Sequence, residues 1–165
     1  MIVSHRAIEK LKIDEGFSSK PYPDASGYSI GYGHFIQKGE KYTFITKQDA
    51  ELLLIKDLQI AINKIKNAII IPLNQNQIDA LVLFAYNTGR SESTLYNLIN
   101  KNAPESEIKK WWISNYITSL GKYFPKLKDR RIWESNLFFE KMNPAAIGSG
   151  IALILIPAIL YFIYK

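Results

Sequence analysis

Hydrophobic residues recur at helical spacing over most of this 165-residue chain. The longest regular run begins after Thr46 and stops before Pro72, with apolar residues returning every three or four positions. They form one stripe, made of Ala50, Leu54, Leu58, Ala61, Ile65 and Ile69. The spacing predicts a long amphipathic helix, and the sequence T-K-Q-D at its start is a capping-box variant with Asp in place of Glu or Gln.

Shorter helical patterns flank this long helix. Ser4 is suited to cap a first helix that ends near Gly16. Residues 73–89 are apolar on all sides at their centre, which predicts the buried axis of a helical lobe with Gly89 as its C-cap. Three further helices are predicted within residues 93–100, 104–116 and 126–140.

Residues 17–45 lack the helical pattern and are rich in turn formers and short β-like runs. This composition predicts a small sheet between the first helix and the long one. The chain is therefore expected to be an α+β protein of two lobes, in which a long helix joins a small β-sheet lobe to a helical lobe.

The end of the chain shows a third pattern. No charged residue occurs from Pro144 to Tyr164, and residues 145–164 are almost wholly apolar. A helix of that length would measure about 30 Å, the thickness of the hydrocarbon core of a bilayer. The sequence thus predicts a domain over 1–141, a short joint over 142–144 and one transmembrane helix over 145–165; a buried core helix is the alternative.

Composition narrows the classes of partner. There are 21 Lys and Arg against 15 Asp and Glu, a formal charge of +6 that suits polyanions or simply favours solubility. No basic stripe is interleaved with aromatic residues, so no nucleic-acid partner is predicted. The chain has no Cys and no His, Asp or Glu cluster at metal-site spacing, so neither disulfides nor any metal or cofactor is expected.

Candidate chemistry is concentrated in residues 15–34, EGFSSKPYPDASGYSIGYGH. Glu15 falls where the first helix should end, and the carbonyl dipoles there favour the protonated carboxyl that a general acid needs. Asp24 falls in a turn-rich loop and is expected to stay ionised, as a base or nucleophile, with Ser29 orienting a water. The alternative is that these are solvated acids and turn formers of an ordinary hairpin.

The same stretch resembles phage-type lysozymes (endolysins) of glycoside hydrolase family 24. The resemblance rests on Glu15-Gly16-Phe17, Tyr22, Asp24, Gly27 and Ile30-Gly31-Tyr32-Gly33-His34. It continues through ITKQDAELLLIKDL, LNQNQIDALVLFAYNTG, STLYNLIN and DRRIWESNLF, in order, over roughly residues 4–140.

This resemblance implies a two-lobe lysozyme fold and cleavage of the β-1,4 bond between N-acetylmuramic acid and N-acetylglucosamine. It also implies a catalytic set of Glu, then Asp after eight residues, then Thr after five. Glu15 and Asp24 match the first spacing, whereas Ser29 replaces Thr and follows Asp24 after only four residues. The shorter spacing predicts a tighter turn after Asp24, and Ser a less rigid hydroxyl.

Substrate contacts are expected around the catalytic set. Alternation along a strand would place Ser29, Gly31 and Gly33 on one nearly bare face that a sugar ring could approach. The predicted substrate-binding residues are Tyr22, Gly31, Tyr32, Gly33, His34 and Phe35. A structural hydrogen bond is the alternative role for His34, and simple packing is the alternative for Tyr32 and Phe35.

The sequence therefore predicts a peptidoglycan hydrolase anchored in a lipid bilayer through residues 145–164. The membrane would belong to the host or to the virion interior, with virion proteins as candidate partners, and the enzyme would serve infection or host lysis. Two rivals are a lytic transglycosylase of the same fold, and a non-catalytic structural or wall-binding protein.

Overall fold

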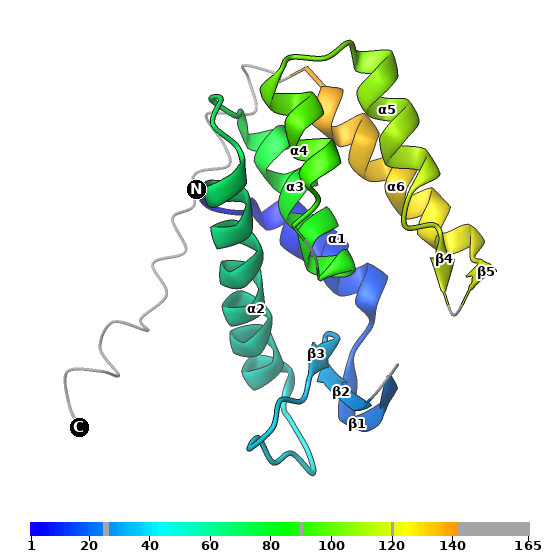
Figure 1. Ribbon diagram of the computed structural model, residues 1–165. Helices are drawn as coiled ribbons and strands as arrows, with labels where there is room; N and C mark the ends of the chain where they lie inside the picture. Colours follow the sequence, from blue (N-terminus) through cyan, green and yellow to red (C-terminus); the bar gives the residue numbers. More distant parts are fainter. Residues whose placement is uncertain (25–26, 90, 120, 142–165) are drawn as a thin grey trace, which may run out of the picture.

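The computed structural model describes residues 1–24, 27–89, 91–119 and 121–141 (Figure 1). Its helices are α1 (His5–Glu15), α2 (Lys47–Ala68), α3 (Gln75–Thr88), α4 (Ser93–Asn100), α5 (Glu105–Ser114) and α6 (Pro125–Phe139). Its strands are β1 (Ser18–Asp24), β2 (Gly27–Gly31), β3 (His34–Phe35), β4 (Thr118–Ser119) and β5 (Lys122–Tyr123). The predicted mixture of helices with one small sheet in the first third of the chain is confirmed.

The sheet between α1 and α2 is antiparallel, with strand order β1-β2-β3. Tyr22 pairs with Ser29, and Asp24 at the end of β1 pairs with Gly27 at the start of β2. This register brings the Asp24 and Ser29 side chains to the same part of the sheet, because paired residues of antiparallel strands project to the same face. A separate hairpin of β4 and β5 precedes α6.

Helix α2 runs from the sheet to the other helices (Figure 1). Its predicted apolar stripe is buried, and Thr46 accepts a hydrogen bond from the backbone of Asp49, as the capping pattern predicts. Its first turn packs closely on β2, where a Cβ atom added at Gly31 would lie only 2.9 Å from the Cβ of Ala50. Gly31 therefore lets the sheet approach α2.

Helix α3 is the buried axis that the sequence predicts. Residues 80–85 are at most 1% exposed, Asn74 and Gln77 form a capping box, and Gly89 ends the helix in the left-handed conformation. Helices α1, α2 and α6 pack against it. This arrangement fixes α1 and α6 relative to each other through one rigid core element.

Helix α1 is anchored to α3 at its first residues. The Ser4 side chain caps α1, and the Ser4 amide and hydroxyl donate to Asp79 of α3 at 2.9 and 2.5 Å. The other end of α1 is Glu15, after which Gly16 adopts φ +70° and turns the chain into the sheet. The helix thus carries Glu15 to the junction of sheet and helices.

The expected membrane-anchored, single-pass localisation is corrected. In the part of the chain that the structure describes, no helix is long and apolar enough to cross a membrane. The longest helix, α2 with 22 residues, bears charged residues such as Lys47, Asp49 and Lys56 on its exposed face, so it is amphipathic. The predicted joint over 142–144 and span over 145–165 lie outside the described residues.

Candidate active site

Glu15 is held at the end of α1 by an arginine from α6. Arg130 Nη2 donates to Glu15 Oε1 at 2.7 Å, and Arg130 Nε lies 3.8 Å from Asp14 Oδ2. The side chains of Arg130 and Glu15 are only 10% and 20% exposed. A charge-assisted hydrogen bond in this half-buried position fixes the direction of the Glu15 carboxyl group.

The other Glu15 oxygen lies against the turn between β2 and β3. A Cβ atom added at Gly33 would be 3.1 Å from Glu15 Oε2, tighter than ordinary van der Waals contact. Gly33 also has φ +84°, a conformation that residues with a side chain rarely adopt. Backbone alone fits at this point, so the turn approaches the carboxyl group closely.

Asp24 and Ser29 form a second polar pair on the sheet. Ser29 is fully buried, and its hydroxyl donates to Asp24 Oδ2 at 2.6 Å. The hydroxyl therefore still reaches the carboxylate with four residues between them in the sequence.

Tyr22 pairs with Ser29 across the sheet. Burial raises the pKa of the Tyr22 phenol, the charges of Asp24 and then Glu15 raise it further, and a hydrogen bond with Ser29 opposes them. Both carboxylates thus raise the pKa of one phenol group. The two acids are held separately, Glu15 by an arginine and Asp24 by a serine.

Of the other predicted substrate contacts, Tyr32 and Gly31 face the protein interior, whereas Phe35 is partly exposed. Tyr32 is 7% exposed and packs its ring 5.5 Å from that of Phe17, so its side chain belongs to the core. Gly31 faces Ala50 of α2 rather than open space. Phe35 is 38% exposed, and its ring covers Gly27 on the same face as Ser29.

His34 is held between two carboxylates. Its Nδ1 lies 2.8 Å from Asp57 Oδ2 on α2, and its Nε2 lies 3.0 Å from Glu40 Oε2. Burial lowers the pKa of His34, but the hydrogen bonds to Glu40 and Asp57 outweigh it and the net shift is upward. Burial raises the pKa of Asp57. The pKa of Glu40 is lowered, first by a hydrogen bond from the Gln37 backbone and then by the hydrogen bond with His34. This geometry matches the structural alternative, in which His34 ties the sheet to α2.

A buried network of Arg131, Glu134 and Trp112 lies next to Arg130. Arg131 Nη2 donates to Glu134 Oε1 at 2.7 Å, and Trp112 Nε1 donates to Glu134 Oε2 at 3.1 Å. Burial raises the pKa of Glu134 to about 7, while Arg131 and Arg130 act in the opposite direction. Arg130 and Arg131 precede Glu134 by four and three positions, the spacing of ion pairs along a helix. Arg131 forms the short pair with Glu134, while Arg130 is directed to Glu15.

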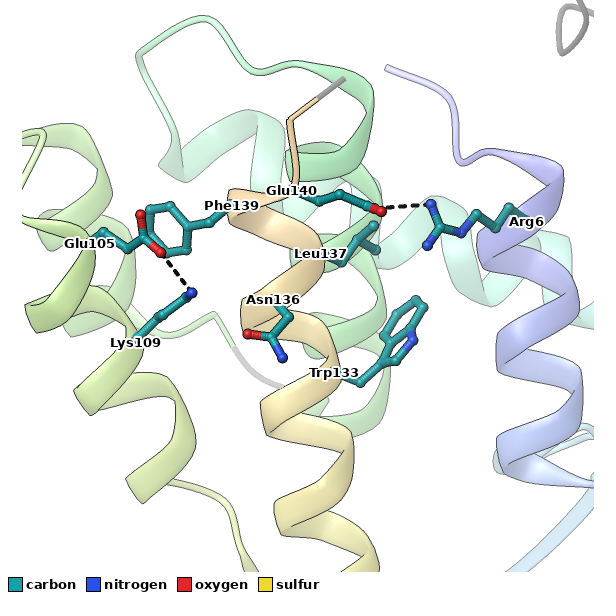
Figure 2. A pocket seen from close by; sticks show the side chains of 8 residues that line it. All are labelled: Arg6, Glu105, Lys109, Trp133, Asn136, Leu137, Phe139 and Glu140. Carbon is teal, nitrogen blue, oxygen red and sulfur yellow. Dashed lines mark hydrogen bonds and ion pairs between the residues drawn. The ribbon is translucent and has the colours of Figure 1, made fainter. Parts of the chain in front are cut away.

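A separate hollow of about 310 Å³ lies between α1, α5 and α6 (Figure 2). It is lined by Arg6, Glu105, Lys109, Trp133, Asn136, Leu137, Phe139 and Glu140. Arg6 pairs with Glu140 at 3.0 Å, and Lys109 pairs with Glu105 at 2.6 Å. The charged groups that line this hollow thus pair with one another. Within the described ranges, no group of three His, Asp or Glu residues is placed to hold a metal ion.

Comparisons with known proteins show the family and the fold of the chain. The family profile described as phage lysozyme matches residues 12–134. The endolysin of Bacillus phage PZA is 33% identical over 159 residues, covering 91% of this chain and 59% of that protein. The endolysin of Bacillus phage B103 is 33% identical over 147 residues, covering 84% and 54%. The chain thus spans less than two thirds of these two relatives.

Solved structures show the same fold. The muramidase domain of SpmX from Asticaccaulis excentricus superposes with a TM-score of 0.74 at 26% identity, covering 85% of this chain and 99% of that one. A mutant of P22 lysozyme superposes with a TM-score of 0.70 at 29% identity, covering 85% and 99%.

Proposed function

The chain belongs to the phage lysozyme family, and from this premise we propose that it is a glycoside hydrolase that degrades peptidoglycan. The bond cleaved is the β-1,4 linkage between N-acetylmuramic acid and N-acetylglucosamine. The names of its relatives, endolysin, lysozyme and muramidase, support this proposal. The observations that support it are the Asp24–Ser29 hydrogen bond on one face of the sheet and the hydrogen bond by which Arg130 holds Glu15 at the end of α1.

Glu15 is the general acid in this proposal. Arg130 engages Oε1, so Oε2, the oxygen beside Gly33, is the atom left to protonate the glycosidic oxygen. The end of a helix is a suitable location because carbonyl dipoles there disfavour negative charge. The positive charge of Arg130 instead favours the ionised carboxylate, and the incoming sugar must compete with Arg130 for the carboxyl group.

Asp24 and Ser29 supply the other half of the reaction. The Ser29 hydroxyl donates to Asp24 and keeps two acceptor lone pairs. The buried Ser29 hydroxyl therefore fixes the Asp24 carboxylate, which would remove a proton from a water as the water attacks the sugar. A water between base and sugar corresponds to inversion of the anomeric centre, as the family resemblance suggests.

Three of the predicted contacts are retained as substrate contacts. Tyr22 pairs with Ser29 across the sheet, Gly33 places backbone beside Glu15, and Phe35 presents a partly exposed ring on the Ser29 face. Gly31, Tyr32 and His34 are given packing roles.

The test is digestion of purified peptidoglycan, followed by mass spectrometry of the fragments. Reducing N-acetylmuramic acid ends are expected, whereas 1,6-anhydro ends would show a lytic transglycosylase instead. Asp24→Asn is expected to slow release by about 10²–10⁴-fold, the usual contribution of a general base. Absence of any soluble fragments from a folded wild-type protein would refute the proposal.

A further inference from the structure

Tyr86 connects the core helix α3 to the turn between β2 and β3. Its hydroxyl donates to the backbone carbonyl of Tyr32 at 2.8 Å, between residues 54 positions apart in the sequence. Residues 80–85, which directly precede Tyr86 on α3, are at most 1% exposed, whereas Tyr86 is only partly buried. Tyr86 therefore extends from the most rigid part of the molecule to the sheet.

The backbone of the turn between β2 and β3 has little conformational preference of its own, because two of its residues are glycines. Gly31 and Gly33, on either side of Tyr32, have φ +67° and +84°, and glycine adopts many other conformations at little cost. Contacts from outside must therefore hold the turn in place. Those contacts include Ala50 against Gly31, Phe17 against the Tyr32 ring, Asp57 of α2 on His34, and the Tyr86 hydroxyl on the Tyr32 carbonyl.

The same turn lies against the candidate acid. Gly33 directly follows Tyr32, whose carbonyl accepts the hydrogen bond from Tyr86. A Cβ atom added at Gly33 would lie 3.1 Å from Glu15 Oε2. Tyr86 is also electrostatically close to this group. Burial is the largest cause that raises the pKa of the Tyr86 phenol. The negative charges of Glu15 and Asp57 raise it further, and the positive charge of Arg130 lowers it.

We propose that Tyr86 is a positioning residue for the reaction. By holding the Tyr32 carbonyl, its hydroxyl keeps the Gly33 backbone against Glu15 Oε2, and Arg130 holds Oε1 from the other side. The carboxyl group is thereby confined between α6 and the turn, with one oxygen directed to the substrate. This inference rests on the proposed role of Glu15 as the acid, and Tyr86 itself touches no substrate.

The test compares Tyr86→Phe with a matched loss of a hydroxyl, Tyr96→Phe. Tyr96 is a buried tyrosine of α4 whose hydroxyl makes no hydrogen bond within the residues that the structure describes. Tyr86→Phe is expected to lower kcat about tenfold with KM within about twofold of wild type, because a slight misplacement of a reacting group costs rate rather than affinity. Tyr96→Phe is expected to leave both constants unchanged.

Amide hydrogen exchange gives a second readout that needs no activity. Loss of one hydrogen bond should speed exchange at residues 31–35 by about three- to tenfold in Tyr86→Phe, and not in Tyr96→Phe. Unchanged exchange would overturn the inference, and so would faster exchange with wild-type kcat. An inactive wild-type protein would overturn the proposed function, and with it the catalytic role of Tyr86, while exchange would still show whether Tyr86 holds the turn.

Discussion

Gly33→Ala tests how closely the sheet confines the Glu15 carboxyl group. Gly33 has φ +84°, and a left-handed backbone costs a residue with a Cβ about 1–2 kcal/mol. The new methyl would also lie 3.1 Å from Glu15 Oε2. The carboxyl group must then shift by a few tenths of an ångström, or the turn must move away.

Arg130 limits the first of these responses, because its 2.7 Å hydrogen bond to Oε1 holds the carboxyl group from the other side. A misplaced catalytic group loses rate steeply, by as much as 10²-fold for 1 Å. Gly33→Ala is therefore expected to lower kcat by about 10–100-fold, in addition to destabilising the fold by about 1–2 kcal/mol.

Gly89→Ala is the matched control, since Gly89 has φ +65° and no heavy atom within 4 Å of an added Cβ. It should show a similar loss of stability in urea unfolding and retain wild-type kcat in a peptidoglycan-release assay. If Gly33→Ala retained wild-type kcat, or if both variants lost kcat equally, the claim that the Gly33 backbone positions Glu15 would be refuted.

Three further predictions concern the polar groups around this site. Ser29→Ala should lower kcat about 10–100-fold because Asp24 loses a charge-assisted hydrogen bond of about 1.5–3 kcal/mol, whereas Ser29→Thr should stay within about threefold of wild type in the same assay. Burial lowers the pKa of His34, but the hydrogen bonds to Glu40 and Asp57 raise it by more, so the net pKa is raised. The stability that follows is complete below the ordinary imidazole pKa of about 6.5 and is lost as the pH rises through the pKa of the folded protein. The melting temperature of His34→Gln should therefore fall less than that of wild type between about pH 6 and 8, and that of exposed His5→Gln should follow wild type; equal slopes for all three would contradict the reasoning. Glu134→Gln should cost about 3–5 kcal/mol in urea unfolding, because it leaves a fully buried guanidinium without its counter-charge, and a loss under about 1 kcal/mol would contradict that.

Elements of the fold that depend on local pattern could be predicted from the sequence. The stripe on α2 and the caps of α1 and α3 follow from helical period and side-chain chemistry within a few residues. The location of Glu15 at the end of α1 follows in the same way, because Gly16 ends the helix. Such signals need no knowledge of the rest of the chain.

Partners that are distant in the sequence could not be predicted. Arg130 lies 115 positions from Glu15, and Tyr86 lies 54 from Tyr32. Both contacts depend on how α6 and α3 pack, which no local spacing encodes. Alternation along the strand also suggested that Gly31 faces the sugar, whereas it faces Ala50 because α2 packs on the sheet there.

The central claim is that Glu15 supplies the proton that releases the sugar, and Glu15→Gln tests it most directly. Clearance of a peptidoglycan suspension should be measured for wild type, Glu15→Gln and Glu9→Gln, an acid on the same helix that pairs with Lys12. We expect Glu15→Gln to slow clearance by about 10²–10⁴-fold while Glu9→Gln stays near wild type. Equal clearance by folded wild type and Glu15→Gln would contradict the account.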